Sequence, residues 1–246
     1  MSSTVVIIPS RLKARRFPNK PMELINGKEM ILHVYDLAKK SEVGDVLVVT
    51  PDKDIDQLIK KNGGNSLISK IDHETGTDRV FEGFKSYYSG NPQVIINLQG
   101  DMPNLDPKAI INLNEHMRKG TSDMSTLASS IKNEDEIQNE NIVKVITNKK
   151  IEKSGFSEAL DFNRGFISQE DKFVYHHIGI YAFTSKALMR YVNLKRSKLE
   201  LKRNLEQMRA LENKMKIYVG YTSTNPLSID TREDLKEVKK IMEKKQ

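Results

Sequence analysis

The sequence contains no cysteine, so disulfide bonds, thiolate metal sites and cysteine nucleophiles are all excluded. It also has no apolar run that approaches the roughly 20 residues of a membrane-spanning helix. The N-terminus leads into a strand-like segment without the pattern of a signal peptide. These absences predict a bacterial-type cytoplasmic enzyme with no membrane partner.

Several common functional motifs are missing as well. Gly27 and Lys28 do not belong to a G-x-x-x-x-G-K-[ST] phosphate loop, and no G-x-G-x-x-G follows the first predicted strand. The G-x-S-x-G elbow of many hydrolases is absent. Zinc, helix-turn-helix and RNA-recognition signatures are missing too, so we attribute the net charge of +7 to lysine bias with an anionic substrate. We expect no nucleic-acid partner.

The composition, with 37% apolar and 30% charged residues, is that of a globular protein. A chain of 246 residues suits one large α/β domain or two small ones. We predict a single domain over residues 1–246. Within it, residues of about 120–185 are expected to form a subregion that closes over substrate or supports dimerisation.

Short runs of β-favouring apolar residues alternate with segments of helical periodicity in the first hundred residues. The predicted buried strands are residues 5–8, 45–50, 66–69 and 94–98. Thr50 and Pro51 resemble the N-cap and first residue of the helix after the second strand. This alternation predicts an α/β fold with a mostly parallel, doubly wound, Rossmann-like sheet.

Beyond Pro103 strands become more frequent than helices. The predicted strands there are residues 124–131, 142–147, 173–183 and 217–221. Ser197 and Glu200 have the spacing of a capping box and predict a helix that continues through Leu211. A charged helix is expected from Thr231 to the C-terminus. We therefore expect a smaller antiparallel section in the middle of the chain, for substrate binding or dimerisation.

A strongly basic loop follows the first predicted strand. Five cations lie within ten residues, namely Arg11, Lys13, Arg15, Arg16 and Lys20. Ligands of open α/β sheets bind at the carboxyl ends of the strands, and Arg and Lys suit phosphate oxygens there. A solvated basic loop explains these residues equally well when they are taken alone.

One carboxylate is a candidate for binding Mg²⁺ from its position alone. Asp101 follows the strand at 94–98, and Mg²⁺ usually takes one or two protein carboxylates beside phosphate oxygens. Asp101 can equally be a turn-forming residue before Pro103. For Asp230 and Thr231 the residues alone favour a capping role at the last helix.

Two further segments carry groups suited to ligand binding. The turn 73–79, HETGTDR, offers backbone and hydroxyl groups at Thr75 and Gly76, although it can also be a simple glycine turn with an N-cap. His177 and Tyr181 share one face of a predicted strand, so both can point at one ligand. Glu206 and Gln207 provide an acceptor and an amide for sugar hydroxyls, whereas structural roles for all four remain open.

These motifs together resemble the sugar-acid cytidylyltransferases, most closely the 3-deoxy-manno-octulosonate cytidylyltransferase (CMP-Kdo synthetase) family. IPSRLKARRFPNKP is similar to the family signature IPARxxSxRLPGKPL. LQGDMP resembles its QGDEP, HETGTDR its HxSGTER, HIGIY its HLGIY, LEQMR its LEQLR and SIDTREDL its GVDTPEDL. The resemblance extends over residues 5–235 in family order.

The resemblance implies transfer of CMP from CTP to the anomeric hydroxyl of Kdo, with release of pyrophosphate, for lipopolysaccharide synthesis. It implies a sheet of the nucleotide-diphospho-sugar transferase type, Mg²⁺ as cofactor and a homodimer. Its implied catalytic residues are Arg11, Lys20, Asp101 and Asp230, of which Asp101 and Asp230 hold the metal. Its implied nucleotide-binding residues are Arg11, Arg16, Lys20, Thr75, Gly76, Arg79 and Gln99. Its implied sugar-acid-binding residues are Gln99, His177, Tyr181, Glu206 and Gln207.

Some positions depart from the family pattern. Asn19 replaces a Gly, and Asn is the residue that best tolerates a left-handed backbone after Gly. Phe17 replaces a Leu, and Met102 replaces a Glu that bears on metal affinity. Three alternatives therefore stay open: another acceptor such as 8-amino-Kdo or a nonulosonic acid, a sugar phosphate with another nucleotide, and a non-catalytic nucleotide-binding module.

Overall fold

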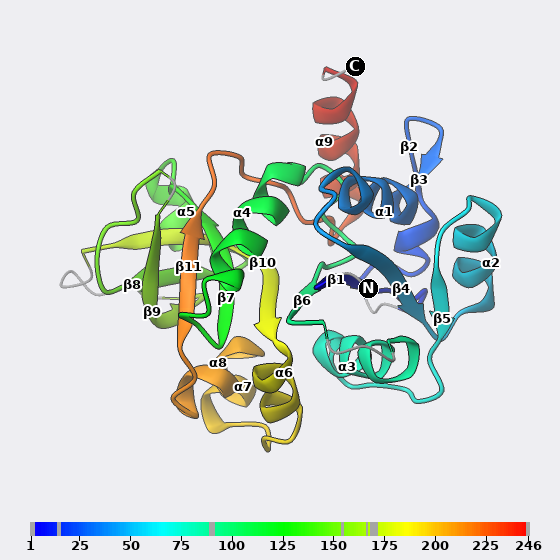
Figure 1. Ribbon diagram of the computed structural model, residues 1–246. Helices are drawn as coiled ribbons and strands as arrows, with labels where there is room; N and C mark the ends of the chain where they lie inside the picture. Colours follow the sequence, from blue (N-terminus) through cyan, green and yellow to red (C-terminus); the bar gives the residue numbers. More distant parts are fainter. Residues whose placement is uncertain are drawn as a thin grey trace. The chain divides into compact units, whose positions relative to one another are not determined.

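The computed structural model describes residues 3–13, 16–88, 92–153, 155–165, 167 and 172–244. The chain forms two compact units (Figure 1). Unit 1 consists of Met1–Ile111 and Pro226–Gln246, and unit 2 of Asn112–Asn225. None of the helices in the described part of the chain is long and apolar enough to cross a membrane.

Unit 1 contains four parallel strands in the order β5-β4-β1-β6. Their bounds are β1 Thr4–Pro9, β4 Asp45–Thr50, β5 Ser66–Ile68 and β6 Val94–Asn97. Every residue of β1 and β6 is buried, as expected for the central strands of a parallel sheet that is covered on both faces. All four strands had been predicted from the apolar runs, so this part of the α/β fold is confirmed.

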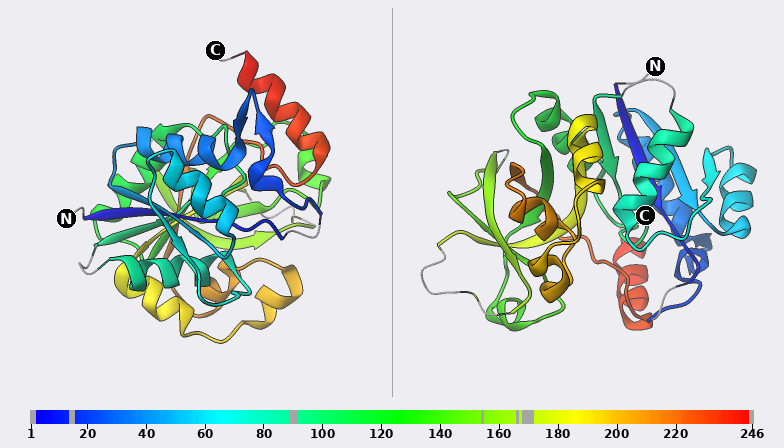
Figure 2. Two further views of the ribbon diagram at one scale, coloured as in Figure 1. Left: turned by 90° about the vertical axis from the view of Figure 1, so that its right-hand side faces the viewer. Right: turned by 90° about the horizontal axis from the view of Figure 1, so that it is seen from below.

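Helices and a small hairpin complete unit 1. The helices are η1 Lys20–Met22, α1 Met30–Lys40, α2 Lys53–Lys61, α3 Gly76–Tyr87 and α9 Arg232–Glu243. The hairpin pairs β2 Leu24–Ile25 with β3 Lys28–Glu29 through Asn26 and Gly27, which both have positive φ as a two-residue turn requires. α9 contacts this hairpin, and Figure 2 shows the two side by side.

The predicted start of α2 is wrong by two residues. α2 begins at Lys53 with Asp52 in the N-cap position, and Thr50 is the last residue of β4. The Thr50 hydroxyl accepts a hydrogen bond from the Asp52 N–H instead, which turns the chain before the helix starts. The Asp52 carboxylate accepts a hydrogen bond from the Leu12 N–H at 2.7 Å, so this side chain fixes the basic loop and does not cap the helix.

Unit 2 contains five strands that pair in a closed ring. Their bounds are β7 Met124–Ser129, β8 Lys144–Thr147, β9 Phe156–Asn163, β10 Val174–Thr184 and β11 Ile217–Tyr221. The order is β10-β7-β11-β9-β8, and β8 pairs with β10 again. Among the described strands of unit 2, only β7 and β11 pair in parallel, so the expected antiparallel character of the middle section is confirmed.

The helices of unit 2 are short. α4 (Pro107–Arg118) begins in unit 1 and ends in unit 2, and the others are α5 Glu134–Gln138, α6 Ser185–Val192, α7 Lys198–Arg203 and α8 Gln207–Glu212. The predicted capping box of Ser197 and Glu200 is present at α7. The predicted continuous helix through Leu211 is wrong, because Asn204 adopts a left-handed backbone with φ of 53° and ends α7 before α8 begins.

Candidate active site

The basic loop after β1 is fixed at both ends by backbone hydrogen bonds. Asn19 adopts φ of 59°, which confirms that this residue replaces Gly at a left-handed position. Its N–H donates to the carbonyl oxygen of Leu12 at 2.9 Å and closes the loop. η1 then begins at Lys20. Arg15 was also predicted to belong to this loop, but it lies outside the described residues.

The Lys20 ammonium joins the two candidate metal ligands. Its Nζ lies 3.2 Å from Oδ2 of Asp101 and 3.6 Å from Oδ1 of Asp230. It also donates to the carbonyl oxygen of Ile229 at 2.5 Å. Arg16 Nη2 lies 3.0 Å from Oδ2 of Asp230. Two carboxylates that are far apart in the sequence therefore meet at one place in unit 1, beside two cations of the basic loop.

Backbone contacts explain why these carboxylates meet. Asp101 follows β6, and its carbonyl oxygen accepts a hydrogen bond from the Ile229 N–H at 3.0 Å. The first turn of α9 is capped by Thr231 and Asp234, which form a complete capping box. Asp230 had been the other candidate for this cap. Since Thr231 fills that role, the Asp230 carboxylate remains available to Arg16.

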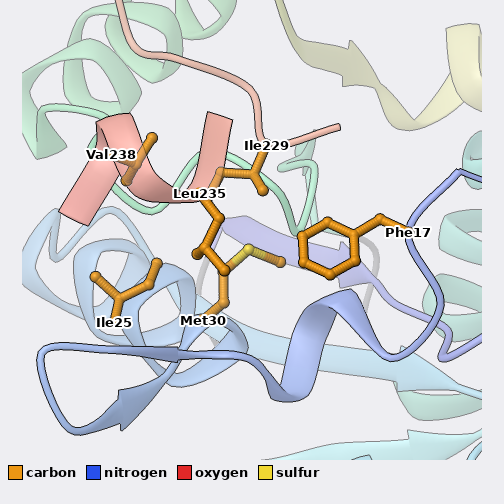
Figure 3. Close-up of a cluster of buried hydrophobic side chains, with 6 residues drawn as sticks. All are labelled: Phe17, Ile25, Met30, Ile229, Leu235 and Val238. Atoms are coloured by element: carbon orange, nitrogen blue, oxygen red, sulfur yellow. The ribbon is translucent and has the colours of Figure 1, made fainter. Parts of the chain in front are cut away.

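A hydrophobic cluster anchors the same segments. It consists of Phe17, Ile25, Met30, Ile229, Leu235 and Val238, all buried. Figure 3 shows the Phe17 ring pointing from the basic loop toward Met30 and the start of α9. The guanidinium of Arg232 lies 5.1 Å from the centre of that ring. Phe17 thus holds the loop with Arg16 and Lys20 against the segment with Asp230.

Met102 is buried in the apolar interior and supplies no ligand atom of a hard cation. Within the described ranges no group of three or more His, Cys, Asp or Glu side chains could hold a metal ion. The carboxylates that the structure brings together on Lys20 are Asp101 and Asp230. Such a pair fits Mg²⁺, which commonly binds to one or two carboxylates and completes its shell with water and phosphate oxygens.

A polar network connects the turn before α3 with the end of β6. Gln99 Nε2 donates to Asn97 Oδ1 at 2.9 Å, and Asn97 Nδ2 donates to Thr77 Oγ1 at 3.3 Å. A Cβ at Gly76 would lie 3.5 Å from Gln99 Oε1, so the turn packs closely against that amide. The Thr75 hydroxyl accepts from the Asp78 N–H and caps α3. The structure thus brings Thr75, Gly76 and Gln99 into one neighbourhood.

Arg79 lies on the first turns of α3 and is almost fully buried. Burial and the nearby charge of Arg11 lower the pKa of its guanidinium. Its Nη2 lies 4.0 Å from the exposed Asp72 carboxylate, and no hydrogen-bond acceptor for Nε or Nη2 is found among the described residues. A buried guanidinium with two adjacent free donors is costly, and a ligand with two adjacent acceptors would satisfy it. Arg11 itself is exposed and is not part of the carboxylate cluster.

Sequence reasoning missed Glu82, which holds the segment before this turn. The Glu82 carboxylate accepts from the Ser69 hydroxyl, from the Lys70 N–H at 2.7 Å and lies 2.6 Å from His73 Nε2. Burial raises its pKa, but the hydrogen bonds from Ser69, Lys70 and His73 outweigh this, so the pKa is lowered. His73 in the motif could have suggested an acidic partner. The sequence spacing did not indicate that this partner would be Glu82 on α3.

In unit 2 the structure brings together three predicted sugar-acid residues. The rings of His177 and Tyr181 lie 5.6 Å apart, and the Tyr181 hydroxyl donates to Gln207 Oε1 at 3.1 Å. A regular strand would separate residues four apart by about 13 Å. A register shift of β10 against β7 between Ile178 and Tyr181 shortens that separation. The bulge, not simple alternation, produces the contact.

His177 is held by the hydroxyl of Thr126. Its Nε2 lies 2.9 Å from Thr126 Oγ1, which is also 3.0 Å and 2.8 Å from the carbonyl oxygens of Ile178 and Ile180. The hydroxyl has one proton to donate to these carbonyls, which favours the tautomer in which His177 carries its proton on Nε2. Burial, with the charges of His176 and Arg164, lowers the pKa of His177 to about 3. The ring is therefore neutral at pH 7.

Gln207 retains one free polar group. Its Nε2 is buried, and no acceptor for it is found in the described part of the chain. α8, which begins at Gln207, is fixed by a buried ion pair of Arg209 and Glu200, with Nε and Nη2 of Arg209 2.8 Å and 2.7 Å from the carboxylate oxygens. Arg209 is therefore structural. The charge of Glu206 adds to burial in raising the pKa of Tyr181, which places that carboxylate near the same group.

Comparisons with known proteins agree on one class of enzyme. A family model described as cytidylyltransferase matches residues 5–217. A 3-deoxy-manno-octulosonate cytidylyltransferase of Bartonella tribocorum is 37% identical over 242 residues, which cover 97% of this chain and 98% of that protein. The enzyme of the same name from Brucella ovis is 38% identical over 94% of this chain and 92% of its own length. A solved structure of CMP:2-keto-3-deoxy-manno-octonic acid synthetase complexed with CTP aligns over 100% of both chains, with a TM-score of 0.89 and 31% identity.

Proposed function

This chain belongs to the cytidylyltransferase family, and on that premise we propose that it transfers CMP from CTP to the anomeric hydroxyl of Kdo. The products are CMP-Kdo and pyrophosphate, and CMP-Kdo serves lipopolysaccharide synthesis. The observation that carries this proposal is the meeting of Asp101 and Asp230 on the Lys20 ammonium, beside Arg16. A compact set of two carboxylates and two cations suits a triphosphate with a divalent metal ion.

The metal ion of this site is proposed to be Mg²⁺, held by Asp101 and Asp230. When bound, it neutralises negative charge on phosphate oxygens in the transition state. Arg11, Arg16 and Lys20 are proposed to bind the triphosphate. Guanidinium groups pair with two phosphate oxygens at once, whereas the ammonium acts as a compact point charge.

The reaction needs no covalent nucleophile on the protein. The anomeric hydroxyl attacks the α-phosphorus and releases its proton to solvent water, and the bond from that phosphorus to the pyrophosphate oxygen breaks. Both the approaching and the departing oxygen carry negative charge, so Lys20 and Arg11 lower the barrier by neutralising it. The remaining task of the chain is to hold the two substrates in line, which turns a bimolecular step into an intramolecular one.

The base of the nucleotide is proposed to bind at the turn before α3. Cytosine presents O2 and N3 as neighbouring acceptors. The Nε and Nη2 of Arg79, which have no hydrogen-bond partner among the described residues, form a matching fork. Thr75 and Gly76 supply backbone groups of the same turn. Gln99, fixed by Asn97, lies against Gly76 and is proposed to contact both the nucleotide and the sugar acid.

The sugar acid is proposed to bind at the cluster in unit 2. The Nε2 of Gln207 supports this assignment, because it finds no acceptor in the described ranges, and a buried amide donor without a partner is costly unless a ligand accepts from it. Neutral His177, Tyr181 and the Glu206 carboxylate supply further donors and acceptors for hydroxyl groups. Kdo is rich in hydroxyl groups, which suits this polar set.

We further infer that unit 1 is a doubly wound sheet. A Cβ at Gly83 of α3 would lie 3.6 Å from Ile7, whereas Gly100 lies beside both Ile8 and Ile31 of α1. Ile7 and Ile8 point to opposite faces of β1, which supports helices on both faces. We also propose a single functional domain over residues 1–246, with about 120–185 as a substrate lid or dimerisation region.

The chain is further proposed to act in the cytoplasm as a homodimer. Leu160 and Leu201, both in unit 2, are exposed apolar side chains that suit a subunit contact.

Pyrophosphate release tests the proposed function. The purified protein is assayed with CTP, Mg²⁺ and a panel of sugar acids, and Asp101→Asn is the matched inactive control. We expect turnover with Kdo. Turnover only with 8-amino-Kdo or a nonulosonic acid assigns that acceptor instead. CTP binding without turnover on any acid supports the non-catalytic nucleotide-binding module and overturns the enzymatic proposal.

A further inference from the structure

The ammonium of Lys20 lies between the carboxylates of Asp101 and Asp230, at the position proposed for the metal ion. It contacts three acceptors, at 3.2 Å on Asp101, at 3.6 Å on Asp230 and at 2.5 Å on the carbonyl of Ile229. We propose that Lys20 is the resident cation of the nucleotide-free enzyme and excludes a divalent metal until the triphosphate binds. This inference rests on the proposed function and concerns the order in which the same site is filled.

The arrangement satisfies the ammonium in both geometry and charge. An ammonium has three N–H donors. Among the described residues it donates hydrogen bonds to Asp101 and to the carbonyl oxygen of Ile229, and Asp230 lies at an ion-pair distance of 3.6 Å. Two carboxylates held together by the backbone bond of Ile229 to Asp101 repel each other, and the positive charge of Lys20 between them relieves this repulsion. A metal ion that binds to the two carboxylates must therefore displace the Lys20 ammonium.

Binding of the triphosphate changes this balance. Its oxygens are strong acceptors that the flexible four-carbon stem of Lys20 can reach by rotation, so the ammonium leaves the carboxylates when phosphate oxygens become available. Asp101 and Asp230 are then left without that counter-ion and attract the divalent ion that accompanies the nucleotide. By linkage the coupling is reciprocal, so the metal ion tightens nucleotide binding by the same factor.

The surroundings support exchange at this position. The side chain of Lys20 is 15% exposed, that of Asp101 26% and that of Asp230 43%, so the ion pair is open enough for a second cation to enter. Arg16, at 65% exposure, neutralises Asp230 from outside and remains available to the phosphates.

Binding of Mn²⁺ alone tests this inference without any measurement of activity. The free-ion signal in electron paramagnetic resonance gives the dissociation constant of Mn²⁺ with and without cytidine 5′-(α,β-methylene)triphosphate. For the wild type we expect weak binding to the nucleotide-free enzyme and binding about tenfold or more tighter with the analogue. Tight binding without nucleotide overturns the inference, whatever the variants do.

Three variants identify the charge of Lys20 as the cause. Lys20→Met removes the charge at similar length, and we expect Mn²⁺ to bind to the nucleotide-free variant about tenfold or more tighter than to the nucleotide-free wild type. Lys20→Arg keeps the charge and should keep that binding weak. Lys13→Met removes an exposed charge of the same loop and should leave it unchanged. Thermal unfolding confirms that each variant is folded.

The outcomes separate this inference from the proposed function. If the wild type transfers CMP to Kdo and Lys20→Met binds Mn²⁺ no more tightly than the wild type, the inference is overturned and the proposed function stands. The expected Mn²⁺ pattern without transfer to any sugar acid overturns the proposed reaction and leaves the exchange of Lys20 for a metal ion standing. If Lys20→Met does not fold, Lys20→Gln, which also removes the charge, is measured in its place, and unchanged Mn²⁺ binding to that nucleotide-free variant overturns the inference.

Discussion

The backbone N–H of Ile229 donates a hydrogen bond of 3.0 Å to the carbonyl oxygen of Asp101. This bond sets the C-terminal segment beside the end of β6, and the next residue, Asp230, brings its carboxylate to the same ammonium as Asp101. The separation of the two carboxylates is thus fixed by main-chain geometry. Substitutions that preserve side-chain size should therefore change the chemistry of the site without disturbing its frame.

Asp101→Asn and Asp230→Asn should each lower kcat/KM for CMP transfer by about 10³-fold, because each removes charge that is proposed to hold the metal ion. Circular dichroism and the midpoint of urea unfolding should match those of the wild type. Asp54→Asn, an exposed Asp on α2, is the matched control and should retain full activity. Full activity of Asp101→Asn with Mg²⁺ would remove that carboxylate from the mechanism.

Phe17→Ala should reduce the free energy of unfolding by about 3–5 kcal/mol, because it removes a buried ring and leaves a cavity among Met30, Ile229 and Leu235. Urea denaturation measures this change. Since the ring also holds the basic loop to the segment of Asp230, the KM for CTP should rise.

Phe183→Ala serves as the control for this variant. It removes a fully buried ring in unit 2 and should destabilise the protein with no effect on the KM for CTP of the folded enzyme. Equal changes of KM in both variants would show that Phe17 has no special role. Phe17→Leu, the residue of the family pattern, should cost only about 1 kcal/mol.

The sequence was sufficient for those parts of the site in which a motif is fixed by its own backbone. The strand before Asp101, the left-handed Asn19 and the capping box beside Asp230 all follow from local rules of burial, backbone preference and capping. Contacts between residues that are far apart in the sequence could not be predicted from such local rules. Nothing in the spacing of Phe17 indicates that its ring meets α9, more than 200 residues later in the chain.

The errors in the prediction arise where tertiary contacts override a local pattern. Apolar periodicity continues through Asn204, so one helix was predicted, but its left-handed backbone ends α7 and turns the chain. The bulge in β10 was likewise not predicted, although it brings His177 to Tyr181. β9 and α6 were not predicted. Both segments mix polar and apolar residues, and the positions that are buried can be recognised only once their packing partners are known.

Arg79→Lys should lower the selectivity for CTP over UTP, measured as the ratio of the two kcat/KM values, by about tenfold or more. Lysine keeps the charge but lacks the fork of donors that matches O2 and N3 of cytosine, and uracil carries a proton on N3. Arg118→Lys, at an exposed position of α4, should leave the ratio unchanged. An equal loss with both nucleotides would instead assign Arg79 to the phosphates.

Arg209→Met should reduce the free energy of unfolding by about 3–5 kcal/mol, because it leaves the fully buried Glu200 carboxylate without its main partner. Double substitution of Glu200 and Arg209 by Met should cost less than the sum of the single changes, as the uncompensated charge disappears. Urea denaturation at pH 7 gives the three values. Additive costs would show that the pair is not coupled.

The pH dependence of this ion pair has a defined sign. Burial raises the pKa of Glu200, but hydrogen bonds from Arg209, Arg196 and Ser197 outweigh this and lower it below the ordinary value of 4.5. The stabilisation is therefore complete above pH 4.5 and is lost as the pH falls through the lower, folded-state pKa. At pH 7 the pair contributes fully.

His177→Gln should reduce the amount by which the free energy of unfolding falls between pH 8 and pH 5. In the folded state burial lowers the pKa of His177 to about 3, whereas the unfolded chain takes up the proton near 6.5. Below pH 6.5 the unfolded state therefore binds more protons, so the free energy of unfolding falls as the pH decreases toward 3. At pH 5 this one ring accounts for a loss of about 2 kcal/mol.

Glutamine keeps a polar group near Thr126 but does not titrate, so the variant should lose about 2 kcal/mol less than the wild type over the same interval. Urea unfolding at pH 8, 7, 6 and 5 measures both profiles. His116, whose pKa burial and the charge of Lys119 lower to about 4, is present in both proteins and cancels in the difference. Parallel profiles would mean that the His177 ring is protonated inside the folded protein, which is incompatible with its proposed role as a neutral hydrogen-bonding group for the sugar acid.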